Sequence, residues 1–424
     1  MYFIKGIFNL ISVIFSNFVF IISLYFLFLS FFGLIKSKKH DNKTPKTSFA
    51  LIVAAHNEEK VIKGIIDSFS RLNYPKELFD VFVIADNCTD RTAAIAREAG
   101  AKVYERFDFG KKGKGYALEW MFSKIFGMKR SYDAVGVFDA DNLVNKNFLL
   151  EMNNKLLDGY KVVQGYLDSK NPGDTWITAN YSISFWLSNR MFQLSRSNVR
   201  LSSQLGGTGF CIKTRTLKEL GWGATCLTED LEFTCKLVLN GHRVGWAHDA
   251  VVYDEKPLTL RQSWSQRKRW MQGFADVASR YFLRLLKKGI KDFDMVALDC
   301  ALYSIQPIIL ILLGIALVLN LYNQFLVVPG MFSDLIRAVN SANSSVAVYG
   351  GILLLLFQLS YNPFILIIEK KMSFKIFLYY ILNPIYSLTW VPISLQGIIG
   401  KNNKEWSHTK HTRNIDINEL EKVN

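Results

Sequence analysis

The sequence has few cysteines, and their spacing does not suggest a disulfide framework. Only 5 of the 424 residues are Cys, an odd number, and no two of them form a C-x-x-C pair. A fold that depends on disulfides is therefore excluded, and the composition suits a reducing compartment. The hydrophobic fraction of 50% also excludes an intrinsically disordered chain.

Acidic residues are scarce relative to basic ones. Asp and Glu number 36 against 51 Lys and Arg, which gives a formal net charge of +15. A basic balance of this size suits a nucleic acid, an anionic membrane surface or a phosphorylated substrate. The positions of the charges must distinguish these partners.

Charged residues are absent from four apolar stretches that are long enough to cross a bilayer, namely residues 7–35, 300–319, 347–368 and 376–400. Five lysines follow the first stretch within residues 36–46, and one lysine precedes it, so the positive-inside rule places residue 36 onward in the cytoplasm. The last stretch contains Pro384 and Pro392. It could form a kinked span, or a re-entrant or interfacial hairpin.

The apolar stretches divide the chain into five parts. We predict an anchor with a basic linker (1–46), a cytoplasmic catalytic domain (47–256), amphipathic interfacial helices (257–294), a membrane domain (295–400) and a basic tail (401–424). In the second part, short apolar runs alternate with segments of helical periodicity. This alternation predicts an α/β domain with a mostly parallel sheet, whose ligands bind at the carboxyl ends of the strands.

Two carboxylates follow the strand expected at residues 134–138. Asp139 and Asp141 stand two positions apart, so in an extended chain they would project to the same side. Such a pair suits Mg2+ or Mn2+, an ion that neutralises the charge of a departing diphosphate. A D-x-D string alone is usually a surface feature, but its place after an apolar strand favours a metal site.

Polar residues also follow the strand expected at residues 81–85. The carboxylate of Asp86 only accepts hydrogen bonds, so it can take the N3 hydrogen of uracil. An Asp that begins a turn is the alternative.

The loop 109–116 lacks the spacing of an ATP-binding phosphate loop. Its glycines can place Lys114 beside a diphosphate, and a solvated basic turn is the alternative.

Two further strings are candidates for chemistry. Asp230 of Thr228-Glu-Asp230 is a candidate general base for an acceptor hydroxyl, and the alternative is a string that only caps a helix. Gln266-Arg-Lys-Arg-Trp270 lies in an expected amphipathic helix at residues 258–286. A helix in the membrane interface would explain it, and so would a site in which Arg269 pairs with a diphosphate and Trp270 stacks on a sugar.

Together these strings resemble the membrane-embedded polysaccharide synthases of glycosyltransferase family 2, which include cellulose, chitin, hyaluronan and poly-N-acetylglucosamine synthases. The family pattern is a strand ending in N-E, a uracil-binding Asp, D-x-D, T/E-E-D and Q-x-x-R-W. The matching strings follow in the same order: Ala55-His-Asn-Glu58, Asp86, Asp139-Ala-Asp141, Thr228-Glu-Asp230 and Gln266-Arg-Lys-Arg-Trp270.

The resemblance implies a Rossmann-like GT-A domain that uses a UDP-sugar and an inverting mechanism. The nucleotide-sugar residues it implies are His56, Asn57, Glu58, Asp86, Lys114, Asp139, Gln266 and Arg269, of which His56 stands where many relatives have Tyr. The metal residues it implies are Asp139 and Asp141. It also implies catalysis by Asp230 with Glu229, and an acceptor site at Trp270, Gly207 and Thr208.

A further resemblance lies in the tail. Trp406-Ser-His-Thr-Lys410 is similar to the gating segment of processive synthases, in which Trp406, Thr409 and Lys410 would close over the nucleotide. This implies a cytoplasmic tail. A solvated basic terminus is the alternative.

The leading hypothesis is a processive, metal-dependent glycosyltransferase. It would transfer a hexose or N-acetylhexosamine from a UDP-sugar to a growing β-linked polysaccharide, and export the product. It would be a multi-pass protein of a bacterial plasma membrane with its catalytic domain in the cytoplasm. It could act together with an accessory membrane subunit. The alternative is a non-processive enzyme that glycosylates a membrane lipid. A third and more remote hypothesis is a non-catalytic basic membrane protein. We expect no nucleic-acid partner, because the chain contains no recognisable nucleic-acid-binding module.

Overall fold

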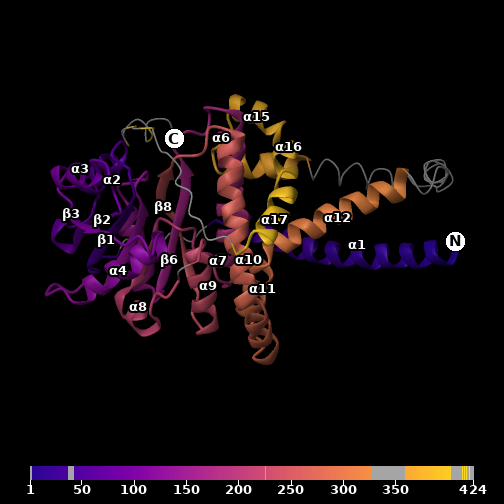
Figure 1. The fold of residues 1–424 in the computed structure, drawn as a ribbon, viewed down its shortest axis with the longest axis horizontal. Coiled ribbons are helices and arrows are strands. Elements are labelled where there is room, and N and C mark those ends of the chain that lie inside the picture. The colour runs from indigo at the N-terminus through magenta and orange to yellow at the C-terminus, as the bar shows by residue number, and fades with distance from the viewer. Residues whose placement is uncertain are drawn as a thin grey trace.

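Two long helices leave an α/β body in the same direction, and further helices lie across their base (Figure 1). The computed structural model describes residues 2–36, 43–224, 226–325 and 359–402, together with Arg413, Ile415, Ile417 and Leu420. The long helices are α1 (Tyr2–Phe31) and α12 (Gln306–Phe325), which pack against each other. All five cysteines are free, so the expectation of no disulfide framework is confirmed.

The body is built on an eight-stranded sheet in the order β3-β2-β1-β4-β7-β6-β8-β5. The strands are β1 (Phe49–Ala55), β2 (Phe79–Asp86), β3 (Lys102–Arg106), β4 (Ala134–Asp139), β5 (Leu143–Val144), β6 (Val162–Ser169), β7 (Phe210–Lys213) and β8 (Val244–Asp254). Strands β3, β2, β1 and β4 are parallel, as are β6 and β8. Strand β7 runs antiparallel to both β4 and β6, so the sheet is mixed.

Helices cover both faces of this sheet. They are α2 (Ile62–Ser70), α3 (Thr92–Glu98), α4 (Lys114–Phe126), α5 (Phe148–Leu157), α6 (Trp176–Ser188), α8 (Thr214–Leu220) and α9 (Glu229–Leu239), whereas the short α7 (Ser195–Asn198) packs against α1. Short helical turns occur at η1 (Phe32–Leu34), η2 (Lys76–Leu78) and η3 (Asn189–Leu194), of which η3 is a π-helical turn continuous with α6. The predicted α/β class is confirmed.

Residues of β1 alternate between two hydrophobic cores. Leu51 and Val53 are buried with Ile62 of α2, whereas Ile52 is buried with Leu118 of α4. This is the period-two pattern of a strand with both faces covered. Each such side chain stabilises the fold by roughly 1.5–3 kcal/mol relative to an exposed one. The carboxyl ends of the central strands are therefore held by packing on both sides.

A second group of helices follows the sheet. It contains α10 (Leu260–Lys291), α11 (Met295–Ser304), the helix Leu359–Ile368, α15 (Phe374–Tyr380), α16 (Asn383–Leu388) and α17 (Trp390–Ile399). Helix α10 begins with a capping box in which Thr259 and Gln262 satisfy each other's backbone N–H groups. A Cβ atom on Gly397 would lie 2.4 Å from Cβ of Met271, so α10 and α17 are in direct backbone contact. The predicted helix at residues 258–286 is thus present and slightly longer.

The predicted membrane spans are only partly matched. Among the described residues, Ile14–Leu34 is the one unbent segment that is long and apolar enough to cross a bilayer. The pair Met295–Ser304 and Gln306–Leu319 is bent by 65°, and the pair Phe374–Tyr380 and Asn383–Ile399 is bent by 50°. The apolar stretch 300–319 is divided between α11, which ends at Ser304, and α12, which begins at Gln306, so it would cross a bilayer as a bent pair of helices.

The bend within residues 376–400 does not lie at the prolines. The chain turns at residues 381–382, and Pro384 occupies the first turn of α16, where its missing N–H is not needed. Residues 347–358 lie outside the described part of the chain, as do the predicted gating residues Trp406, Thr409 and Lys410. A multi-pass topology therefore stays a prediction.

Candidate active site

A cavity of about 1280 Å³ lies at the carboxyl ends of β1, β2 and β4 and extends to α10, α12 and α17. Each predicted site residue in the described part of the chain lines it. These are His56, Asn57, Glu58, Asp86, Lys114, Asp139, Asp141, Gly207, Thr208, Glu229, Asp230, Gln266, Arg269 and Trp270. They come from segments up to 214 positions apart, from His56 to Trp270, which the fold brings to one place.

The turns after β1 and β2 are tied together. Asn57 and Asn87 adopt positive φ values of 57° and 52°, a conformation that Asn tolerates better than most residues. Nδ1 of His56 lies 2.7 Å from the carbonyl oxygen of Asp86, to which it donates. The N–H of Thr89 donates to Oδ1 of Asn57 at 2.8 Å. These two hydrogen bonds hold the turn after β1 against the turn after β2.

Asp86 is paired with Arg106, a residue that the sequence motifs do not indicate. Nη1 of Arg106 donates to Oδ1 of Asp86 at 2.6 Å, and both side chains are largely buried. Burial raises the pKa of Asp86, and the Arg106 guanidinium opposes that shift. Among the described residues, the second carboxylate oxygen, Oδ2, has no hydrogen-bond donor. Asp86 therefore keeps an acceptor for a ligand while Arg106 holds its position.

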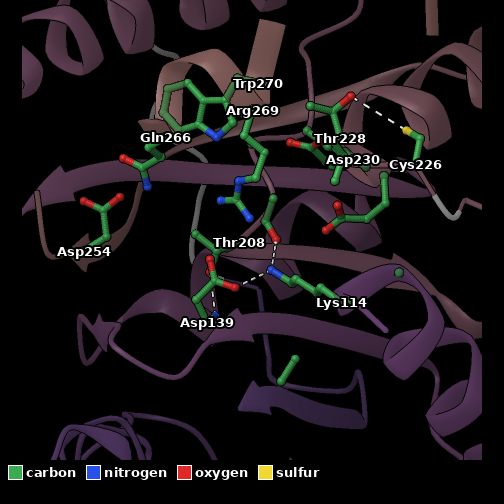
Figure 2. Close-up of a pocket in the computed structure, with 18 of the residues that line it drawn as sticks. Lys114, Asp139, Thr208, Cys226, Thr228, Asp230, Asp254, Gln266, Arg269 and Trp270 are labelled. Atoms are coloured by element: carbon green, nitrogen blue, oxygen red, sulfur yellow. Dashed lines mark hydrogen bonds and ion pairs between the residues drawn. The ribbon is translucent and has the colours of Figure 1, made fainter. Parts of the chain in front are cut away.

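Lys114 stands at the first position of α4, after Gly113 with a φ of 115°. Its Nζ pairs with Oδ1 of Asp139 and donates to the carbonyl oxygen of Gly207 at 2.6 Å (Figure 2). Burial alone would lower the pKa of Lys114, but the nearby carboxylates, Asp139 foremost, raise it overall. Lys114 is therefore a charged group that links the end of β4 to the loop at Gly207.

The D-x-D carboxylates do not project from an extended strand. Strand β4 ends at Asp139, and Asp141 lies in the turn that follows, which corrects the expected geometry. The side chain of Asp139 is 41% exposed, whereas Asp141 is buried and its Oδ2 accepts from the N–H of Glu255 at 2.9 Å. No group of three or more His, Cys, Asp or Glu side chains among the described residues could hold a metal ion. A divalent ion bound here would take its further ligands from water or the substrate.

Asp230 and Glu229 begin α9, close to Lys114. The N–H of Leu231 donates to Oδ1 of Asp230 at 2.8 Å, while the side chain of Thr228 makes no capping hydrogen bond. A Cβ atom on Gly207 would lie 3.6 Å from Oδ2 of Asp230, so this oxygen faces the Gly207 loop. Burial raises the pKa values of both carboxyls. A carboxylate with a raised pKa is suited to accept a proton near neutral pH.

The Q-x-x-R-W residues form the opposite wall of the cavity (Figure 2). Gln266 accepts a hydrogen bond from the hydroxyl of Tyr181, and the ring of Trp270 lies 5.8 Å from that of Tyr181 and 6.1 Å from that of Phe185. The side chain of Arg269 extends into the cavity and pairs with no described carboxylate. This wall therefore offers an aromatic surface and an uncompensated positive charge.

Thr208 and Asp254 complete the site in ways that the motifs do not indicate. The N–H of Asp139 donates to Oγ1 of Thr208 at 3.1 Å, and that hydroxyl donates in turn to Asn142, so Thr208 fixes the end of β4. Asp254 ends β8, lines the cavity and pairs with the buried Lys256 at 2.6 Å. Burial raises the pKa of Asp254 to about 6. Like Asp86 and Asp139, Asp254 is an acidic residue at a strand end, and this position is the signal that could have indicated it.

Comparison with known proteins gives a consistent picture. A family model described as "Glycosyltransferase like family 2" matches residues 45–273, which is more than half of the chain. The chain is 29% identical over 271 residues to the probable glycosyltransferase YdaM of Bacillus subtilis, covering 60% of this chain and 62% of that protein. It is 31% identical over 246 residues to the beta-monoglucosyldiacylglycerol synthase of Synechocystis sp., covering 54% and 48%.

A third relative is the poly-beta-1,6-N-acetyl-D-glucosamine synthase of Staphylococcus aureus, which is 26% identical over 277 residues, covering 62% of this chain and 64% of that protein. The matches thus span between about half and two thirds of the length of these relatives. A solved structure of the mannosyltransferase PcManGT from Pyrobaculum calidifontis, with GDP-Man and Mn2+, has a TM-score of 0.58 at 17% identity and covers 92% of this chain and 97% of that one. This likeness supports the fold.

Proposed function

The chain belongs to the glycosyltransferase-like family 2, and from this premise we propose that it transfers a sugar from a UDP-sugar to the hydroxyl group of a membrane-held acceptor. The observation that carries the proposal is the meeting of Asp86, Lys114, Asp230 and Trp270 in one cavity. These residues supply, in order, an acceptor for a base edge, a cation for a diphosphate, a base for a hydroxyl and a surface for a sugar ring.

The donor would lie across the ends of β1, β2 and β4. In this proposal Asp86, with the turn at His56, Asn57 and Glu58, binds uridine through the free oxygen Oδ2. Lys114 and Arg269 approach from opposite walls, so they can neutralise the diphosphate between them. Gln266, one turn before Arg269 on α10, adds an amide that can donate to the same group.

A divalent ion also forms part of the proposal. Asp139 and Asp141 would hold Mg2+ or Mn2+, with the remaining ligands from the diphosphate, and the bound ion would neutralise charge on that group. The exposed carboxylate of Asp139 fits this role better than Asp141, whose oxygens already accept hydrogen bonds from Asn142 and Glu255. Lys114 would then share Asp139 with the ion or turn toward the diphosphate.

Asp230 would act as the general base. It removes the proton of the acceptor hydroxyl while that oxygen forms a bond to C1 of the sugar, and the bond from C1 to the diphosphate oxygen breaks. Attack opposite the leaving group inverts the configuration at C1. Burial and the nearby carboxylate of Asp139 raise the pKa of Asp230, which favours its protonated form once the proton has moved, and Glu229 lies beside it.

The acceptor is either a growing polysaccharide or a membrane lipid. The sequence motifs favour the polysaccharide, to be exported through a multi-pass membrane domain. One observation favours the lipid: the cavity continues from Trp270 toward the candidate spans between apolar side chains, namely Phe192, Met271, Phe274, Leu310 and Trp390. Acyl chains are compatible with such a wall, whereas a glycan would leave its hydroxyl groups without partners there.

The proposal is tested with the purified full-length protein. It is incubated with radiolabelled UDP-sugars, Mg2+ or Mn2+, and a membrane lipid extract, and the products are separated by thin-layer and size-exclusion chromatography. Label in a glycolipid of one or two sugars supports the lipid acceptor. Label in a long product that a matched glycosidase degrades supports the polysaccharide, and no product from any UDP-sugar contradicts the proposed donor.

A further inference from the structure

One face of α10 carries basic and apolar side chains outside the cavity described above. Arg261, Lys268, Leu283 and Ile290 lie within about 60° of one another around the helix at 3.6 residues per turn. Leu283 and Ile290 are 73% and 63% exposed. On the helix wheel this face adjoins Met271, which contacts α17, so it lies on the side of α10 near α17.

A groove of about 560 Å³ lies at the first turns of this face. It is lined by Leu260, Arg261, Trp264, Ser265, Lys268 and Gln396. Nε1 of Trp264 donates to Oε1 of Gln396 of α17 at 2.9 Å, which fixes one wall of the groove. Neither Arg261 nor Lys268 forms a salt bridge with an acidic side chain in the described part of the chain. Two positive charges therefore face the groove without a protein counter-charge.

The groove lies where water and bilayer would meet. Its basic wall is on α10, whereas its neighbour α17 exposes Leu395 at 50% and Ile399 at 76%. Figure 1 shows α10 and α17 across the base of α1 and α12, the helices that leave the α/β body. Since α1 and η1 together form the candidate span Ile14–Leu34, a bilayer around α1 would place its surface near this base.

We propose that this groove binds the headgroup of an anionic phospholipid. Arg261 and Lys268, two turns apart on one face, would pair with the phosphate, and Ser265 between them would donate a further hydrogen bond. The acyl chains would lie along Leu395 and Ile399. Trp264 suits the same place, because an indole with one polar edge favours the boundary between headgroups and hydrocarbon.

The other end of α10 repeats the pattern and supports the proposal. Phe293, in the turn after α10, is 91% exposed, and Lys287 and Lys291 stand beside Leu283 and Ile290. Exposed apolar groups flanked by lysines are typical of a helix that lies in a membrane interface. The whole length of α10 would therefore rest on the bilayer, with the groove as its specific lipid site.

Native mass spectrometry of the full-length protein in detergent tests this. The probes are phosphatidylglycerol and phosphatidylcholine with identical acyl chains, and the variants are Arg261→Gln/Lys268→Gln and the charge-preserving Arg261→Lys/Lys268→Arg. Lys63→Gln/Lys129→Gln is the matched control, because it removes two exposed charges on the side of α2 and α4.

The wild-type protein should bind one phosphatidylglycerol more tightly than phosphatidylcholine. The Arg261→Gln/Lys268→Gln variant should bind phosphatidylglycerol about thirtyfold more weakly, as expected when two basic side chains near an anionic headgroup are lost. The control and the charge-preserving variant should keep the preference. The proposal is wrong if the wild type does not distinguish the two lipids, or if the Gln variant binds phosphatidylglycerol as the control does.

Discussion

Gly273 of α10 sets the position of the proposed base. A Cβ atom at this residue would lie 2.5 Å from both Cγ2 and Oγ1 of Thr228, the residue before Glu229 and Asp230. Ordinary contacts between such atoms are about 3.5 Å, so Gly273→Ala must move α10 and the start of α9 apart by on the order of 1 Å. Thr228 is buried, so its side chain has little room to turn away.

Two effects should follow from Gly273→Ala. Overpacking of this kind costs about 1–3 kcal/mol, which a lowered thermal unfolding midpoint would reveal. A shift of about 1 Å in the base should slow sugar transfer by on the order of 100-fold. A protein that is less stable but still folded would keep most of its transfer rate. The expected loss of rate therefore reports the shift of the base and not the loss of stability.

Two further variants make this test specific. Gly127→Ala is the control, because its nearest atom would be 3.7 Å away, and it should leave midpoint and rate unchanged. Thr228→Ala/Gly273→Ala removes both atoms at 2.5 Å and should recover part of the rate. Gly273 does not set the position of the base if Gly273→Ala transfers sugar within twofold of the wild type, or if the double variant is no faster than the single one.

Three other predictions concern charged groups. Burial raises the pKa of Asp230, and a general base must be ionised to accept a proton. The rate of sugar transfer should therefore fall on acidification with a midpoint above about pH 5, and a midpoint near pH 4 would contradict this. Arg106→Met leaves Asp86 without its partner and should weaken UDP binding about tenfold in calorimetry, and unchanged affinity would argue against the pairing. Arg196 and Asp299 form a fully buried ion pair at 2.8 Å, so Arg196→Met should cost about 3–5 kcal/mol in denaturant unfolding, and Arg196→Met/Asp299→Leu should cost less.

The location of the site could be predicted from the sequence because of one rule. Asp86 and Asp139 follow apolar strands, and the carboxyl ends of parallel strands meet at one edge of a sheet. Arg106 could not be found in this way, because its contact depends on the register of β2 and β3, which places it opposite Asp86. The expected D-x-D geometry is wrong because strand β4 ends at Asp139, two residues before Asp141, so the two side chains do not project from one extended segment.

Other differences also depend on the path of the chain in space. The antiparallel strand β7 is only four residues long and follows the glycine-rich loop at Gly207. It contains no long apolar run from which a strand could be predicted. Hydropathy identified the apolar residues near Ile305 but not the bend there, because apolar composition carries no information on helix direction. Pro384 suggested a kink, yet it sits where a proline fits a helix start.

In the proposed reaction, Asp230 deprotonates an acceptor for transfer from a UDP-sugar. The most direct measurement compares wild-type protein and Asp230→Asn with the same radiolabelled UDP-sugar, after equal UDP binding by the two has been verified. The wild type should transfer the sugar, and the variant should do so at a rate lower by about 10²–10⁴-fold. Equal transfer rates for the two proteins would contradict it.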